Sequence, residues 1–296
     1  VVFYGSILEL LTADEQKAVL AHELAHYHLW QRDDNDYLVT DRLLDSMVQQ
    51  SRAENAHIQT ARHYRLYTEI YADQGSYFVL GDVKLLLSAL IKVSTGLKNV
   101  SVESYLEQAD EILAKGHKNS EGESHPENYI RAKALLMYSE QEENFDKKLK
   151  EMIEGQRDLD GLDLLGQETI SVETEFFVKT ILKASFLKDQ EQFQNRLALY
   201  QNTDSKLKEE VVLKIESYQD EKLCDYFVYL LLDFVGLDEE LKDPMALHCH
   251  KIATEHGLEK SYVEKLCKEL GYKKKDWNTL LKNADEVLAE VEKNIG

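Results

Sequence analysis

The 296-residue chain contains few cysteines, prolines and glycines. Its three cysteines, Cys224, Cys249 and Cys267, are odd in number and lie in the second half, so they make no disulfide framework and favour a reducing compartment. Only two prolines occur beside 13 glycines, while Leu, Glu, Lys and Ala dominate. This composition predicts a mostly α fold.

Positive charge and long apolar runs are also scarce. There are 35 Lys and Arg residues against 55 Asp and Glu, a formal net charge of −20, which argues against nucleic acid or an anionic membrane as the main partner. A membrane span needs about 18 uncharged apolar residues, and the best candidate, Tyr77 to Leu97, is interrupted by Asp82, Lys84 and Lys92. We therefore expect a soluble, cytoplasmic protein without a membrane span.

One pattern of chemistry-bearing residues lies near the start of the chain, where residues 22–26 read His-Glu-Leu-Ala-His. His22 and His26 are four residues apart, so on a helix they share a face and can bind one zinc ion. Glu23 adjoins the first ligand, where its carboxylate can take a proton from a metal-bound water. The alternative is two hydrogen-bonded core histidines, but Glu23 in an apolar helix would then need a partner of its own.

The residues around this pattern predict a helix. Thr12-Ala13-Asp14-Glu15 has the spacing of a capping box, in which the Thr12 hydroxyl and the Glu15 carboxylate each cap a backbone amide. A largely apolar stretch follows to about Trp30. The two histidines therefore lie in mid-helix, among small residues that let other elements pack close.

A catalytic zinc site needs a third protein ligand, and Glu69 is the candidate. Residues from Thr40 to about Val79 read as helix with one break near Asn55. In its second part Glu69 and Asp73 share a face, so Glu69 can bind zinc while Asp73 accepts the free N–H of a ligand histidine. An exposed acidic pair is the alternative to this hypothesis. The competing third ligands are His57, His63 and Glu54.

These separated pieces together resemble the gluzincin peptidases of the CAAX-prenyl endopeptidase and HtpX type. The family pattern is H-E-x-x-H, a later E-x-x-x-D, and a downstream His-Pro followed by Arg. In this chain it is met by His22-Glu23-x-x-His26, Glu69-x-x-x-Asp73, Ser124-His125-Pro126 and Arg131. Glycine is more usual at the position of Ala25, and we expect a slightly wider helix contact to absorb the difference.

The resemblance covers about residues 1–140 and implies a zincin-type metallopeptidase domain of a soluble branch, N-terminally incomplete. The strand that normally precedes the active-site helix is only partly present, with Val1 to Tyr4 as a small β element. By resemblance His125 donates to the oxyanion, and Arg131 holds Asp73 or the oxyanion. A helix cap at His125 and a surface position for Arg131 stay open as alternatives.

Residues 141–296 are predicted to form an acidic, all-α domain. We expect helices at about 171–187, 189–201, 204–219, 221–235, 244–256, 260–270 and 277–294, after a connector at 158–171. Residues 232–240 and 252–258 loosely resemble TerB-like helical domains. His248-Cys249-His250 is no metal site by this interpretation, because adjacent side chains on a helix point apart.

The leading hypothesis is a zinc-dependent endopeptidase that holds one Zn²⁺ per chain through His22, His26 and Glu69. Glu23 transfers the proton and His125 stabilises the oxyanion. Asp73 and Arg131 support the metal ligands without binding the metal themselves. The substrate is a peptide or protein, which the helical tail recruits, or the tail binds a regulatory protein. The alternative is a non-catalytic interaction module on a zincin scaffold.

Overall fold

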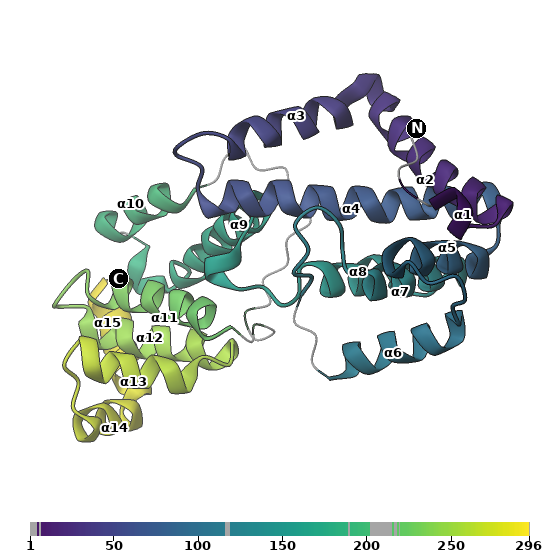
Figure 1. The fold of residues 1–296 in the computed structure, drawn as a ribbon. Coiled ribbons are helices and arrows are strands. Elements are labelled where there is room, and N and C mark those ends of the chain that lie inside the picture. Colours follow the sequence, from purple (N-terminus) through teal and green to yellow (C-terminus); the bar gives the residue numbers. More distant parts are fainter. Residues whose placement is uncertain are drawn as a thin grey trace. The chain divides into compact units, whose positions relative to one another are not determined.

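The computed structural model describes residues 5, 7–115, 119–188, 190–201, 215, 218 and 220–295. Within these residues every regular element is a helix and there is no strand (Figure 1). The predicted helical fold is therefore confirmed. The small β element expected at Val1 to Tyr4 lies outside the described residues.

The chain divides into two compact units, Val1–Gln156 and Arg157–Gly296. The sequence prediction put the division after residue 140, and α8 (Phe145–Ile153), which packs against α7 (Asn128–Ser139), lies in the first unit. The first unit contains α1 (Ile7–Leu10), α2 (Ala13–Gln31), α3 (Asp36–Val48), α4 (Asn55–Leu80), α5 (Val83–Thr95), α6 (Val102–Ala114), α7 (Asn128–Ser139) and α8 (Phe145–Ile153). The second contains α9 (Leu164–Ile181), α10 (Glu191–Tyr200), α11 (Glu221–Val235), α12 (Lys242–Glu255), α13 (Glu259–Glu269), α14 (Lys274–Lys282) and α15 (Ala284–Ile295).

Helix α2 begins with the predicted capping box. The Thr12 hydroxyl accepts from the Glu15 amide at 3.3 Å, and the Glu15 carboxylate accepts from the Thr12 amide at 2.8 Å. An alanine-rich face is buried, whereas Leu20 and Leu24 on another face are 39% and 53% exposed. The small side chains of the buried face allow other helices to approach closely.

Helix α4 makes such a close approach to α2. A Cβ atom at Gly75 of α4 would lie 2.5 Å from the Cβ of Ala25, nearer than real Cβ atoms come. One residue further on, the buried Ser76 hydroxyl donates to the Ala18 carbonyl at 2.9 Å. The sequence predicted a wider helix contact at Ala25, and this is wrong. The contact is close, and the absence of a side chain at Gly75 makes room for Ala25.

A buried ion pair joins α2 to α5. The Lys92 ammonium lies 2.7 Å from Glu15 Oε1, and the Ser88 hydroxyl donates to the same oxygen at 2.7 Å. Burial disfavours charge on Glu15, but the bonds from Lys92, Ser88 and Thr12 outweigh it and lower the pKa of Glu15 to about 2. The start of the helix that carries the histidines is therefore held by charge as well as by packing.

Three element boundaries in the first unit bear on the site. The break expected near Asn55 is real, because α3 ends at Val48 and α4 begins at Asn55. Pro126 was expected in the first turn of a helix, but α7 begins at Asn128, so Pro126 lies in the preceding loop. That loop also carries His125.

The second unit is built around α11, most of whose side chains are apolar and buried. Its buried core draws on α9 to α14, and α15 packs against it. Helix α9 begins at Leu164, inside the stretch expected to be a connector, because Asp163 caps it by accepting from the Gly166 amide. The helix expected at 277–294 is two helices, α14 and α15. Most of the predicted helix 204–219 lies outside the described residues. All three cysteines are unpaired.

We predict that Gly75→Ala destabilises the first unit because it overpacks the contact with Ala25. Overpacking costs about 1–3 kcal/mol, partly offset by about 1 kcal/mol of helix propensity. The double variant Ala25→Gly with Gly75→Ala restores the space between the helices. Its free energy of unfolding, measured in urea, should lie within about 0.5 kcal/mol of the wild-type value. Additive effects of the two substitutions would contradict the close contact.

We also predict that the Glu15–Lys92 pair stabilises the protein above about pH 4.5 and loses this effect as the pH falls toward 2. The folded pKa of Glu15 lies below its unfolded value, so the unfolded chain binds the proton first. Glu15→Gln should lower the free energy of unfolding by up to about 3 kcal/mol at pH 7. The difference from the wild type should shrink below pH 4.5. Asp14→Asn, which removes an exposed pair with Lys17, is the control and should change little.

Candidate metal centre

Helices α2 and α4 bring His22, His26 and Glu69 together. The two Nε2 atoms of His22 and His26 are 3.3 Å apart. The Glu69 carboxylate oxygens lie 3.4 Å from His22 Nε2 and 3.2 Å from His26 Nε2. Within the described part of the chain, these three residues are the one group whose ligand atoms could share a metal ion.

The donor set and its spacing fit zinc. Ligand atoms that are each roughly 2.0–2.2 Å from a tetrahedral zinc ion lie about 3.3–3.6 Å apart, close to the three observed distances. In addition, the buried Glu69 Oε2 receives no well-formed hydrogen bond from the described residues, since its neighbours His22 Nε2 and Arg131 Nη1 are both 3.4 Å away. A metal ion at about 2.0–2.2 Å would satisfy this buried oxygen more fully than these long contacts do. Two imidazoles and one carboxylate also leave a fourth position open, as catalytic zinc sites do.

Asp73 and Arg131 lie directly behind these three residues. Asp73 Oδ1 is 3.0 Å from His22 Nδ1, on the side of the ring opposite the cluster. Arg131 of α7 donates to both oxygens of Asp73, from Nε at 2.8 Å and from Nη2 at 2.6 Å. Its Nη1 is also 3.4 Å from Glu69. Arg131 is buried, so the alternative of a surface position is wrong.

Charge in this cluster is balanced between neighbours. Burial disfavours the imidazolium of His22, but the hydrogen bonds to Asp73 and Glu69 raise its pKa to about 9. Burial also disfavours charge on Glu69, whereas His22, His26 and Arg131 lower its pKa well below the ordinary range. The pKa of Asp73 is lowered against burial, chiefly by Arg131. A cation at this position would take the place of the proton on His22.

Glu23 and His125 reach the solvent beside the cluster. Glu23 is exposed on α2, next to His22. His125 is 59% exposed, yet its Nε2 lies 3.4 Å from Glu69 Oε1, and its Nδ1 lies 2.8 Å from the Ser124 hydroxyl. The Trp30 ring is also near, 6.4 Å from the His26 ring between centroids. An incoming molecule could therefore meet both side chains.

The competing ligands have other contacts. The Glu54 amide donates to His57 Nδ1 at 3.1 Å, so these two residues form the N-terminal cap of α4. His63 is not part of the cluster. The exposed His28 of α2 lies outside the cluster, with its Nδ1 3.1 Å from the Tyr71 hydroxyl.

The geometry can be set beside known proteins. Residues 1–139 match the model of peptidase family M48. This region is similar to the M48 metallopeptidases, a family of hydrolases. It contains the histidine pair, Glu69, Asp73, His125 and Arg131, and it ends within the first unit.

A curated relative of the M48 region is the plastoglobule-localized metallopeptidase 48, chloroplastic, of Arabidopsis thaliana. It is 32% identical over 117 residues, which cover 37% of this chain and 33% of the relative. The chain thus spans about a third of the length of that protein. No solved structure matches the chain. Among the described helices, none is both long and apolar enough to cross a membrane.

Sequence reasoning missed two residues that support this site, Arg62 and Lys92. Arg62, which binds the loop before α7, lies seven residues before Glu69 and therefore on the same face of α4. The seven-residue spacing from Glu69 could therefore have indicated that Arg62 lies on the face of α4 that carries the site. Lys92, by contrast, is linked to α2 only through the tertiary fold, and no local pattern points to it.

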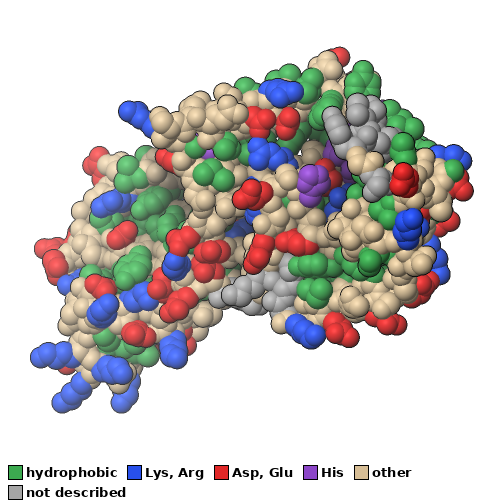
Figure 2. Space-filling model, in the orientation of Figure 1, with side chains coloured by type: hydrophobic (Ala, Val, Ile, Leu, Met, Phe, Trp, Pro, Cys, Tyr) green, Lys and Arg blue, Asp and Glu red, His purple; other side chains and the backbone are tan. Residues whose placement is uncertain are grey.

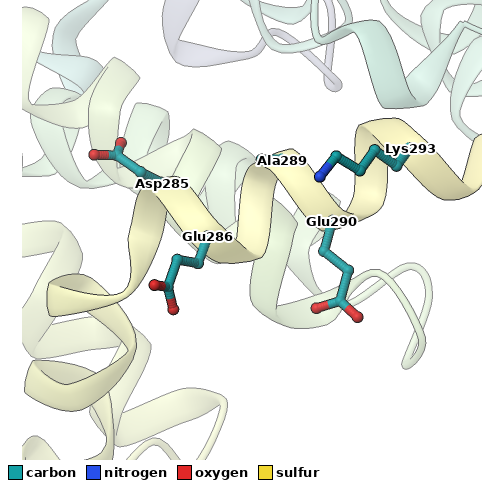
Figure 3. A pocket seen from close by; sticks show the side chains of 5 residues that line it. All are labelled: Asp285, Glu286, Ala289, Glu290 and Lys293. Carbon is teal, nitrogen blue, oxygen red and sulfur yellow. The ribbon is translucent and has the colours of Figure 1, made fainter.

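The second unit offers no comparable cluster in its described residues. In α12, His248 Nε2 lies 2.9 Å from the Ile181 carbonyl, Cys249 is buried, and His250 lies 3.5 Å from Glu259. A surface depression along α15 is lined by side chains of that one helix that point in different directions (Figure 3). On the face shown in Figure 2, histidine side chains reach the surface in the first unit, beside both acidic and basic groups.

We predict that zinc stabilises the full chain and that chelation reverses the effect. At a free zinc concentration of 100 times the Kd, the free energy of unfolding should rise by about 2.7 kcal/mol. His22→Ala should abolish the zinc-dependent rise. His28→Ala removes an exposed histidine of the same helix and should preserve it. An equal response of both variants to zinc would contradict this site.

Proposed function

We propose that the first unit is a zinc-dependent endopeptidase in which His22, His26 and Glu69 hold the metal. The observation that supports this best is the triangle of 3.2–3.4 Å contacts between these ligand atoms, with Glu23 exposed beside it. When bound, zinc would supply Lewis-acid chemistry, lowering the pKa of a water and polarising a carbonyl. The M48 match of residues 1–139 supports the same reaction class.

The chain's own side chains then have separate roles. Glu23 accepts a proton from the attacking water and returns it to the leaving amine, which makes it the general base and acid. His125 donates from Nε2 to the oxyanion that develops on the scissile carbonyl. Asp73 accepts from His22 Nδ1, so Nε2 of that ring is left to face the metal, and Arg131 keeps Asp73 charged.

The substrate of this reaction is a peptide or protein. Recruitment of that substrate by the acidic helical unit, or binding of a regulatory partner there, stays a prediction from composition. The cytoplasmic location likewise stays a prediction from the cysteine count. A non-catalytic interaction module is the alternative function, and the catalytic test below separates the two.

We predict that Glu23→Gln binds zinc with unchanged stoichiometry but cleaves peptides about 10²–10⁴ times more slowly. The glutamine keeps the size of the side chain and removes the base. Cleavage of a peptide library by zinc-loaded full chain, followed by mass spectrometry, measures the rate. Asp14→Asn, an exposed acid on the same helix, should keep the wild-type rate. Full cleavage by Glu23→Gln would overturn this mechanism, and a zinc-loaded wild type that cleaves nothing would favour the interaction module.

A further inference from the structure

The segment of residues 119–127, here named the His125 loop, is tied to α4 by Arg62. The guanidinium donates from Nε to the Gly122 carbonyl at 2.7 Å and from Nη2 to the Ser120 carbonyl. Its Nη1 donates to Gln59 of the same helix at 3.2 Å. One half-buried cation therefore holds two carbonyls of the loop backbone that are two residues apart.

The same loop is closed on itself at the other end. Glu127, just before α7, accepts from the Ser120 hydroxyl at 2.7 Å and from the Glu121 amide at 2.7 Å. Ser120 is fully buried, and its amide donates to the Ile153 carbonyl at 3.1 Å. At residue 122 a Cβ atom would overlap the carbonyl oxygen of His125. The backbone of Gly122 thus packs directly on that of His125.

These contacts bear on the metal centre because α4 carries both Arg62 and Glu69. The two residues are seven apart, so they lie on one face of the helix, about two turns from each other. At one end of this face Glu69 belongs to the metal centre, and at the other Arg62 binds the His125 loop. The Nε2 atom of His125 in turn lies 3.4 Å from Glu69 Oε1. His125 itself is mostly exposed, so its own burial does not hold it in place.

We propose that Arg62 is a positioning residue, which, through the carbonyls of Ser120 and Gly122, holds the imidazole of His125 beside the metal centre. The proposal rests on the endopeptidase function above. Arg62 touches neither the metal ligands nor Asp73 in the contacts that the structure describes. Its effect on the reaction is therefore expected to pass entirely through His125.

The test compares zinc-loaded full-length Arg62→Gln with the wild type. We expect a fall in kcat of at least about tenfold, because a displacement of about 1 Å is enough for losses of this order and more. Zinc stoichiometry should not change. Arg62→Lys, which keeps a cationic donor, should recover part of the rate. Arg65→Gln, which breaks the pair with Asp45 one turn along the same helix, should leave the rate unchanged.

A double-mutant cycle separates positioning from general destabilisation. If Arg62 acts through His125, Arg62→Gln should cost nothing further in a His125→Ala background. If the fall in kcat of the double variant equals the product of the two single falls, the proposal is overturned. Amide hydrogen exchange supplies a second readout, since the amides of residues 120–122 should exchange faster in Arg62→Gln and not in Arg65→Gln.

Unchanged exchange in Arg62→Gln would also overturn the proposal, because it would show that the loop does not depend on Arg62. Failure of the endopeptidase function gives a different result. In that case the wild type would bind zinc and cleave no peptide, while the exchange data would still show whether Arg62 holds the loop.

Discussion

The contact between α2 and α4 is the constraint on which the rest of the site depends. His22 and His26 belong to one helix and Glu69 and Asp73 to the other, so their distances are set by how closely the two backbones approach. Gly75 against Ala25 fixes that approach, and the Ser76 bond to Ala18 fixes the register along the helices. A ligand triangle with edges of 3.2–3.4 Å leaves little tolerance for a change in either.

Charge is the second organising feature of the first unit. Two carboxylates and an arginine are buried next to two imidazoles, an arrangement that is stable only while each charge keeps its partner. Arg131 compensates Asp73, and Asp73 in turn orients His22. Glu69 is the member that is least well satisfied, since the contacts of its Oε2 with His22 and Arg131 are both 3.4 Å long and neither is a well-formed hydrogen bond. A divalent cation would complete this balance, which is why the cluster is better suited to a metal than to structural ion pairs alone.

Local sequence patterns predicted the parts of the site that lie on single helices. The four-residue spacings of His22 with His26 and of Glu69 with Asp73, and the capping box at Thr12, follow from helix geometry alone. The resemblance to a family added His125 and Arg131 as candidates, and the structure brings both near Glu69.

Features that depend on packing between helices were out of reach. Gly75 opposite Ala25 could not be predicted, because a glycine within a helix gives no sign of its partner. In the sequence Lys92 only interrupts an apolar run, yet in the fold it is buried against Glu15. The start of α7 was misplaced by two residues, since Pro126 suits a loop before a helix as well as its first turn. In the second unit, the connector prediction was wrong at α9 because the cap by Asp163 went unnoticed.

If the proposal holds, His22, His26 and Glu69 bind one zinc ion together. Zinc K-edge X-ray absorption of the zinc-loaded full chain tests it most directly, because the spectrum reports the atoms bound to the metal. We expect two imidazole rings per zinc at roughly 2.0–2.1 Å, further oxygen ligands and no sulfur, with one imidazole lost in His26→Ala. A sulfur ligand, or an unchanged imidazole count in His26→Ala, would contradict it.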